Sequence, residues 1–235
     1  MPYSIALPNI QISYSSTLQL SRELLLVGGG REPADDWLRD VATNREIWCI
    51  DKGIDICYQL KALPKYLAGD FDSCHLESLT WATKKGSIID AFNRDKDFTD
   101  TQAVLDKAKA ANAYTILTGA LGKRFDHTLS TILSFAHHRL PGCIVDEQES
   151  IFFLYPEESI TLTMVNPPKA ISLFPLTAQV QGVTTQGLKW ELTKAELTQT
   201  NPYAISNEQK NNDKITISLE TGILAIYICH KETGL

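Results

Sequence analysis

Apolar runs alternate with amphipathic segments along the first 145 residues, and this pattern predicts strands that alternate with helices. Buried strands are expected at Leu24–Val27, Glu46–Ile50, Leu63–Ala68, Tyr114–Thr118 and Cys143–Val145. Helices are expected at Asp35–Ala42, Ile54–Leu60, Leu76–Lys85, Thr101–Asn112 and from His127 to about Arg139. Such alternation predicts a mostly parallel sheet with helices on both faces.

After about residue 147 the apolar positions follow a period of two. The runs Ser159–Val165, Ile215–Leu219 and Ile223–Ile228 alternate in this way, and turn signals such as Asn166-Pro167-Pro168 separate them. Several short strands with this punctuation predict a β-sandwich. We therefore expect an α/β N-terminal domain with a mostly parallel sheet over residues 1–147. A C-terminal all-β sandwich domain is expected over residues 148–235.

Composition narrows the class of protein. The chain has 235 residues, of which 43% are hydrophobic, and its net charge of −6 argues against nucleic acid or an anionic membrane as a partner. No apolar run approaches the roughly 20 residues that span a bilayer. The first 20 residues carry no lysine or arginine, unlike a secretory signal. Five scattered cysteines without a Cys-x-x-Cys pair favour reduced thiols, so a cytoplasmic location is expected.

Two carboxylates follow the predicted strand that ends at Ala68, in the stretch Gly69-Asp70-Phe71-Asp72-Ser73. In an extended chain Asp70 and Asp72 point to the same side, and the carboxyl edge of an open sheet is where α/β folds bind ligands. Paired carboxylates suit Mg²⁺, which takes oxygen ligands together with substrate phosphates. A polar turn is the alternative, because Gly, Asp and Ser are ordinary loop residues.

Two further stretches precede predicted helices. Asp95-Lys96-Asp97-Phe98-Thr99-Asp100 has three acids in six residues, which exceeds what the capping box of Thr99 and Gln102 requires. Gly119-Ala120-Leu121-Gly122-Lys123-Arg124-Phe125-Asp126-His127 combines glycines and cations before a helix, which suits a polyphosphate. A solvated turn with Asp126 as the N-cap is the alternative there. The Gly28–Gly30 run after the first buried strand can bring backbone amides to phosphate or form a flexible turn.

The stretches that begin at Gly69, Asp95 and Gly119 occur in this order along the chain. They are followed by Gly187-Leu188-Lys189-Trp190 and Ser206-Asn207. This set of motifs resembles the thiamine pyrophosphokinase family over roughly residues 22–230. The resemblance implies transfer of the pyrophosphoryl group of ATP to the hydroxyl of thiamine, which gives thiamine diphosphate and AMP. It also implies Mg²⁺, ATP as co-substrate, and a homodimer whose active sites are shared between subunits. The α/β domain would carry catalysis, and the β domain would bind thiamine and form the dimer.

The resemblance also implies roles for particular residues. The catalytic carboxylates would be Asp70, Asp72, Asp97 and Asp100, of which Asp70, Asp72 and Asp100 would hold Mg²⁺. Either Asp97 or Asp100 would accept the hydroxyl proton. The nucleotide end would involve Asp51, Ser73, Thr99, Lys123, Arg124, Asp126 and His127. Trp190 would stack on thiamine, with Ser206 and Asn207 at its polar edge, although a core position for Trp190 is the alternative.

Two rival functions use the same features. One is another Mg²⁺-dependent pyrophosphoryl-transfer enzyme or phosphohydrolase that acts on a different alcohol. The other is a non-catalytic regulator that binds a nucleotide or thiamine. Product analysis separates the first rival, because AMP and thiamine diphosphate are the products expected only of a thiamine pyrophosphokinase.

Overall fold

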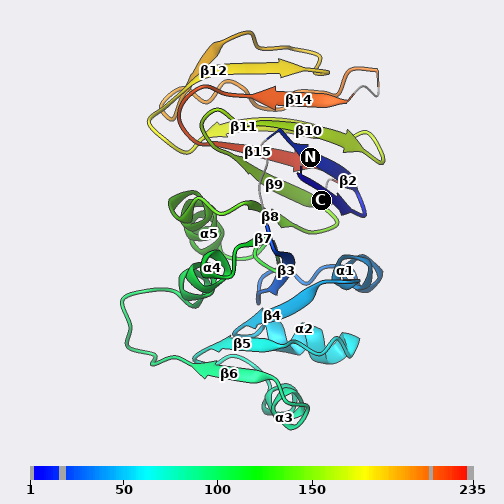
Figure 1. The fold of residues 1–235 in the computed structure, drawn as a ribbon, viewed down its shortest axis with the longest axis vertical. Helices are drawn as coiled ribbons and strands as arrows, with labels where there is room; N and C mark the ends of the chain where they lie inside the picture. The colour runs from blue at the N-terminus through cyan, green and yellow to red at the C-terminus, as the bar shows by residue number, and fades with distance from the viewer. Residues whose placement is uncertain (1–2, 16–19, 212–213, 232–235) are drawn as a thin grey trace. The chain divides into compact units, whose positions relative to one another are not determined.

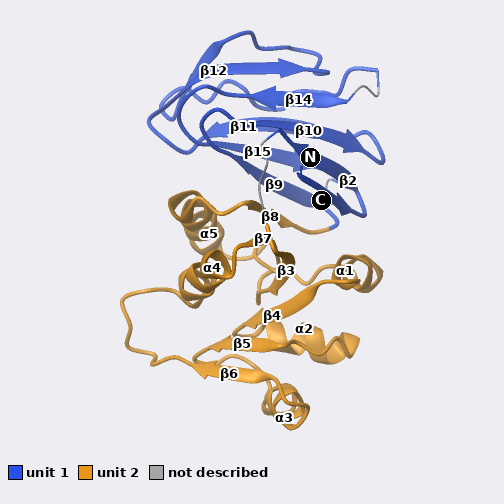
Figure 2. Cartoon of the chain, viewed as in Figure 1, with its two compact units in different colours: residues 1–19, 147–235 blue, residues 20–146 orange. Residues whose placement is uncertain are grey.

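The computed structural model describes residues 3–15, 20–211 and 214–231. The chain forms two compact units, drawn in different colours in Figure 2. Residues 20–146 form one of them, called here the α/β unit. Residues 1–19 and 147–235 form the other, called here the β unit. Each unit is described by itself.

Six parallel strands form the sheet of the α/β unit, in the order β8-β7-β3-β4-β5-β6. They are β3 (Arg22–Val27), β4 (Glu46–Ile50), β5 (Tyr66–Gly69), β6 (Ile88–Ala91), β7 (Ala113–Thr118) and β8 (Gly142–Val145). The central strands are apolar on both faces, and every residue of β7 is buried. A parallel sheet covered on both faces requires such continuous apolar runs, which explains why the sequence pattern revealed these strands.

Helices cover both faces of this sheet, as Figure 1 shows, with α1, α2 and α3 on one face and α4 and α5 on the other. They are α1 (Asp35–Ala42), α2 (Gly53–Leu60), α3 (Leu76–Lys84), α4 (Asp100–Ala110) and α5 (Phe125–His138). The predicted α/β architecture with a parallel sheet is confirmed. Helix α5 begins at Phe125, earlier than expected, and its N-cap is Arg124. Asp126 therefore lies in the first turn, and the alternative that it is the N-cap is wrong.

The β unit consists of antiparallel strands. One sheet has the order β1-β2-β10-β14-β12-β13, and three further strands pair in the order β11-β15-β9. They are β1 (Tyr3–Leu7), β2 (Ile10–Tyr14), β9 (Glu149–Leu154), β10 (Ser159–Met164), β11 (Ala170–Pro175), β12 (Gln179–Gln186), β13 (Ala195–Thr198), β14 (Ile215–Ser218) and β15 (Leu224–Cys229). A separate antiparallel region is thus present, as predicted after residue 147.

The N-terminal strands belong to the β unit and not to the α/β unit, in contrast to the predicted domain limits. The α/β domain was expected over residues 1–147, whereas the compact α/β unit comprises Leu20–Asp146. Strands β1 and β2 form a hairpin whose second strand pairs with β10, Ile12 lying opposite Leu162. The side chains of Ile10, Ile12 and Tyr14 are buried. Residues 1, 2 and 16–19, which the prediction also included, lie outside the described residues.

The sequence predicted reduced thiols and no membrane-spanning segment. The five cysteines, all within the described ranges, are free thiols. Among the described residues, no helix is long and apolar enough to cross a membrane.

A largely buried histidine gives the β unit a testable pH dependence. Nε2 of His230 lies 2.8 Å from Oγ of the buried Ser150. Burial and the neighbouring Lys231 lower the pKa of His230 from 6.5 to about 4. Between these two values the unfolded chain binds a proton that the folded unit does not, so the free energy of unfolding falls as the pH falls. At pH 5 the shifted pKa of His230 lowers the free energy of unfolding by about 2 kcal/mol relative to neutral pH.

We expect the His230→Gln variant to lose less free energy of unfolding than the wild type when the pH falls from 7 to 5, because glutamine does not titrate. Urea unfolding at pH 7 and pH 5 measures it, with the wild type losing more stability than the variant. Equal losses in both proteins would show that His230 is protonated in the folded unit as readily as in the unfolded chain.

Candidate active site

Asp51 follows β4 at the carboxyl edge of the sheet. Its backbone adopts a left-handed conformation, with φ of 48°, and its amide donates to the carbonyl of Ala68 at 2.9 Å. Helix α2 begins two residues later at Gly53, where an added Cβ would lie 1.9 Å from the carbonyl oxygen of Val27. This close packing of α2 on β3 fixes the turn that presents Asp51.

The Asp51 carboxylate is only partly satisfied. Its Oδ2 accepts a hydrogen bond from Oγ of Ser73 at 2.6 Å. Its Oδ1 is buried and has no hydrogen-bond partner within the described ranges. Because a buried polar atom without a partner is costly, this oxygen indicates that a ligand belongs beside it.

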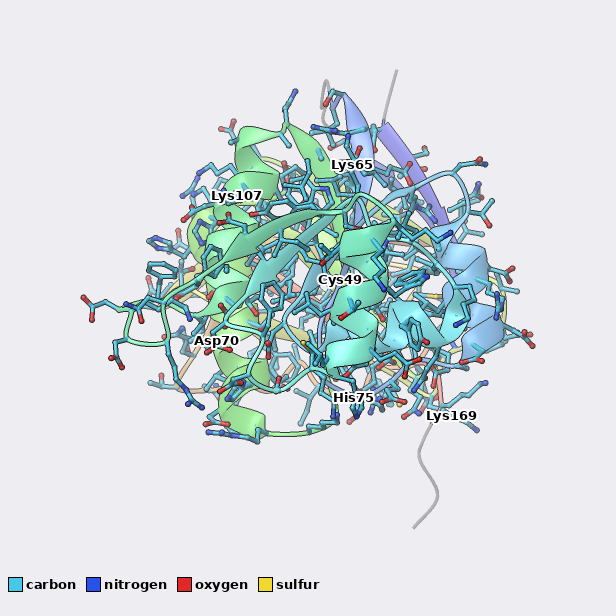
Figure 3. All side chains as sticks on the ribbon, turned by 90° about the horizontal axis from the view of Figure 1, so that it is seen from below. Cys49, Lys65, Asp70, His75, Lys107 and Lys169 are labelled. Carbon is cyan, nitrogen blue, oxygen red and sulfur yellow. The ribbon has the colours of Figure 1, made fainter. Side chains whose placement is uncertain are left out.

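Asp70 and Asp72 follow β5 on a tight turn rather than an extended segment. Phe71 has φ of 56°, and the amide of Asp72 donates to Oδ1 of Asp70 at 3.2 Å. Figure 3 shows Lys65 and Asp70 at the opposite ends of β5. The turn still keeps the two side chains close together, although strand alternation is not the reason.

Three carboxylates converge at this edge. Asp51, Asp70 and Asp72 each offer an oxygen, and these oxygens lie within 4.8 Å of one another. Burial raises the pKa of Asp51, and the nearby charges of Asp70 and Asp100 raise it further, against the hydrogen bond from Ser73. Carboxylates held this close repel each other, and a divalent cation with oxygen ligands offsets that repulsion. The structure brings Asp51, rather than Asp100, into this tight group.

Asp100 begins α4 beside the group. The capping box predicted for Thr99 is confirmed, since its side chain accepts from the amide of Gln102 and the Gln102 side chain accepts from the amide of Thr99. Oδ1 of Asp100 lies 3.2 Å from Nζ of Lys96. Asp97 is exposed on the loop before α4 and is absent from the cleft lining that the described residues form.

A cleft lies at this edge of the α/β unit. Its lining combines two carboxylates with several cations and glycines. The residues are Gly28, Gly29, Gly30, Ile50, Asp51, Lys52, Ser73, Thr99, Asp100, Thr101, Leu117, Gly119, Ala120, Leu121, Lys123, Arg124, His127, Thr128 and Thr131. Of the predicted nucleotide residues, Asp126 is the one outside this lining as formed by the described chain.

The glycine run at the end of β3 has a packing role. The amides of Gly28 and Gly30 donate to the carbonyls of Thr118 and Gly119, so the amides of these two glycines are not free to bind phosphate. At Gly119, with φ of 66°, an added Cβ would lie 2.3 Å from the carbonyl oxygen of Gly28. Side chains are excluded here because the ends of β3 and β7 touch.

Cations of the segment before α5 reach this cleft. Nζ of Lys123 donates to the carbonyl of Gly29 at 3.0 Å. The Arg124 guanidinium pairs with Asp126 at 2.6 Å, and this pair lowers the pKa of the Asp126 carboxyl. Both side chains of the pair are exposed, so Asp126 orients the guanidinium at the surface. His127 follows in the first turn of α5 and lines the cleft.

Trp190 and Asn207, predicted to bind thiamine, contact each other in the β unit. Oδ1 of Asn207 accepts from the amide of Trp190 at 3.2 Å, and its Nδ2 donates to the Trp190 carbonyl at 2.7 Å. The Trp190 residue is 55% exposed, and Nζ of Lys189 lies 4.5 Å from its ring centroid. This exposure argues against the alternative of a core tryptophan. Ser206, in the left-handed region, donates its amide to Oγ of Ser172 at 3.0 Å.

Three cations near the carboxylates were missed by sequence reasoning. Lys52 lines the cleft, where a Cβ at Gly29 would lie 2.9 Å from the Lys52 Cβ. Arg94 pairs with Asp72, and Lys96 pairs with Asp100. The clustered acids in the sequence could have indicated these cations, because carboxylates that lie close together need counter-ions.

Fold and cleft together define an α/β protein that presents clustered carboxylates and cations at the carboxyl edge of a parallel sheet and that also contains a separate antiparallel unit. Family models match both parts. Residues 39–144 match "Thiamin pyrophosphokinase, catalytic domain", and residues 159–224 match "Thiamin pyrophosphokinase, vitamin B1 binding domain". These two matches together cover more than half of the chain. The chain belongs to the thiamine pyrophosphokinase family.

Individual relatives agree with this family. Thiamine pyrophosphokinase of Bacillus subtilis (strain 168) is 25% identical over 204 residues, which cover 85% of this chain and 94% of that protein. Thiamine pyrophosphokinase 2 of Oryza sativa subsp. japonica is 26% identical over 176 residues, or 69% of this chain. This chain spans 64% of the length of the rice relative.

Solved structures share the fold. The crystal structure of thiamine pyrophosphokinase from Bacillus subtilis aligns with a TM-score of 0.77 at 22% identity, covering 89% of this chain and all of that one. Thiamin pyrophosphokinase from Candida albicans aligns with a TM-score of 0.72 at 17% identity, covering 90% of each chain.

Proposed function

We propose that this chain is an enzyme that transfers the pyrophosphoryl group of ATP to the hydroxyl of thiamine, giving thiamine diphosphate and AMP. The observation that carries the proposal is the convergence of Asp51, Asp70 and Asp72 within 4.8 Å, next to a cleft that Lys123 and Arg124 also line. Clustered carboxylates with cations nearby suit a polyphosphate bound with a metal ion.

The carboxylates fit Mg²⁺. The buried Oδ1 of Asp51, which lacks a hydrogen-bond partner among the described residues, is a hard oxygen ligand of the kind this ion takes. We assign Asp51, Asp70 and Asp72 to hold the ion, with Asp100 at its side as the sequence suggests. Mg²⁺ supplies neutralisation of the charge on the phosphate oxygens when it is bound.

The remaining chemistry belongs to the side chains of this chain. Lys52, Lys123 and Arg124 bind and orient phosphate oxygens along the cleft. Asp100 lines the cleft and Asp97 is exposed, which favours Asp100 as the acceptor of the thiamine hydroxyl proton. Positioning and charge neutralisation supply most of the rate in such transfers.

Thiamine binding and assembly complete the proposal. We assign Trp190 to stack on the thiamine ring because Trp190 is 55% exposed, and we assign Ser206 and Asn207 to the polar edge of thiamine because Asn207 hydrogen-bonds to the Trp190 backbone. The six-stranded antiparallel sheet and the strands β11, β15 and β9 of this unit would form a β-sandwich. A homodimer with shared active sites, and a cytoplasmic location, complete the hypothesis.

The Trp190→Ala variant is expected to raise the KM for thiamine about ten-fold, while the KM for ATP changes little, because the lost contact is stacking on a flat ring. Steady-state kinetics with each substrate varied in turn measures this effect. Tyr203→Ala is the matched control, since Tyr203 is another exposed aromatic residue of the β unit. Normal thiamine KM in a folded Trp190→Ala protein would exclude the stacking role.

The decisive experiment is a turnover assay with ATP, thiamine and Mg²⁺, with products separated by chromatography. Equal amounts of AMP and thiamine diphosphate, abolished by a chelator, are the expected result. Formation of ADP or free pyrophosphate would favour a different phosphoryl-transfer enzyme or a phosphohydrolase. Binding of the substrates without any product would favour the non-catalytic regulator.

A further inference from the structure

The loop of residues 92–99 places two cations on carboxylates of the active site. This loop joins β6 to α4 and carries Arg94 and Lys96. The Arg94 guanidinium forms an ion pair with Oδ2 of Asp72. Nζ of Lys96 lies 3.2 Å from Oδ1 of Asp100. Each of these cations therefore neutralises a carboxylate that the proposed function uses.

The two cations differ in how firmly they are held. The Lys96 side chain is only 10% exposed, and its Nζ lies 5.8 Å from the centroid of the Phe92 ring. Phe92 in turn packs edge-on against Phe98, with ring centroids 5.9 Å apart. Lys96 is thus fixed within the loop. The Arg94 side chain is 76% exposed, so water surrounds most of it and an exposed ion pair of this kind is weak.

A divalent cation and the guanidinium compete for the same carboxylate. Binding both at short distance to Oδ2 of Asp72 is unfavourable, because the two positive charges repel each other. Arg94 is the weaker and more exposed ligand, so a metal ion displaces it. A released guanidinium on this loop remains near the phosphate groups that accompany the metal, and its planar set of donors matches phosphate oxygens.

We propose that Arg94 is a tethered counter-ion of Asp72 that is displaced by the divalent cation and then binds the nucleotide phosphates. This inference rests on the proposed function for the identity of the nucleotide. It adds that the same residue weakens metal binding in the free protein and strengthens binding of the metal–nucleotide complex.

The test measures Mn²⁺ binding by electron paramagnetic resonance, in which free and bound Mn²⁺ give different signals. Without nucleotide, Arg94→Gln is expected to bind Mn²⁺ about two- to five-fold more tightly, the range that corresponds to an exposed ion pair. With a non-hydrolysable ATP analogue, the variant is expected to bind the Mn²⁺–nucleotide complex more weakly than the wild type. A purely structural defect weakens both, so the opposite signs identify the exchange of partners.

Two variants control the measurement. Arg94→Lys keeps a positive charge and is expected to behave nearly as the wild type for Mn²⁺ alone. Lys107→Gln removes another exposed ion pair, 3.1 Å from Asp90, and is expected to leave both affinities unchanged. The proposal is overturned if Arg94→Gln binds Mn²⁺ alone no more tightly than the wild type, or if it binds the metal–nucleotide complex equally well.

The outcome is separable from that of the proposed function. If the opposite shifts occur and no thiamine diphosphate forms in the turnover assay, the role of Arg94 stands and the assigned reaction fails. If thiamine diphosphate forms and the shifts are absent, the reaction stands and the role of Arg94 fails.

Discussion

Replacing Asp72 by asparagine is expected to lower kcat for thiamine diphosphate formation about 100-fold or more, which corresponds to about 3 kcal/mol of barrier. An amide is a poor ligand for Mg²⁺ and adds no negative charge, so one of three converging carboxylates is lost. The Asp72 side chain is 40% exposed and lies on a surface turn. The change should therefore leave the fold intact, and a normal melting temperature and circular dichroism spectrum would show this.

Asp40→Asn is the matched control, because Asp40 is an exposed carboxylate on α1 outside the cleft lining formed by the described residues. We expect that variant to keep wild-type kcat. If the folded Asp72→Asn protein also turns over at the wild-type rate, Asp72 does not hold the metal ion, and the assignment of the acidic group must be withdrawn.

Mixing two impaired variants is expected to restore activity if the active sites are shared between subunits. Asp72→Asn alters the α/β unit and Trp190→Ala alters the β unit. In a mixed dimer with shared sites, one site receives both defects and the other receives neither. Random pairing of equal amounts makes about half of the dimers mixed, so about a quarter of all sites should be intact.

The experiment unfolds the two variants together, refolds them, and measures turnover at a thiamine concentration far below the wild-type KM, where Trp190→Ala alone keeps about a tenth of the wild-type rate. Each variant refolded by itself is the control. Differently tagged chains allow mixed dimers to be isolated and counted. Mixed dimers that are present and folded, yet show no regained activity, would mean that each site is built within one chain, and the metal assignment would be unaffected.

Local patterns in the sequence predicted much of the α/β unit. Strand β7 is recognisable because a strand buried on both faces is a continuous apolar run. The start of α4 is recognisable because the capping box of Thr99 and Gln102 involves residues only three apart. The acids of the site and the adjacent cations Lys123 and Arg124 stood out for a similar reason, since like charges crowded together in sequence require an explanation beyond folding.

Long-range pairing was not predictable in the same way. Strand β2 pairs with β10, a segment that follows it by more than a hundred residues, and no local pattern specifies such a partner. The strands β11, β12 and β13 were likewise not expected, and the mixed polar and apolar residues of β12 and β13 give weak strand patterns.

The chain by itself determined the order of elements in the α/β unit, the residue types of the cleft and the family to which it belongs, because burial and capping are recorded in neighbouring residues. Only the tertiary structure decided which charges meet. Asp51 joins Asp70 and Asp72 because the ends of β4 and β5 are adjacent in the sheet. Arg94 reaches Asp72, 22 residues away, because their two loops follow neighbouring strands β6 and β5. Contacts between separate loops depend on strand order, which the sequence pattern of each element does not contain.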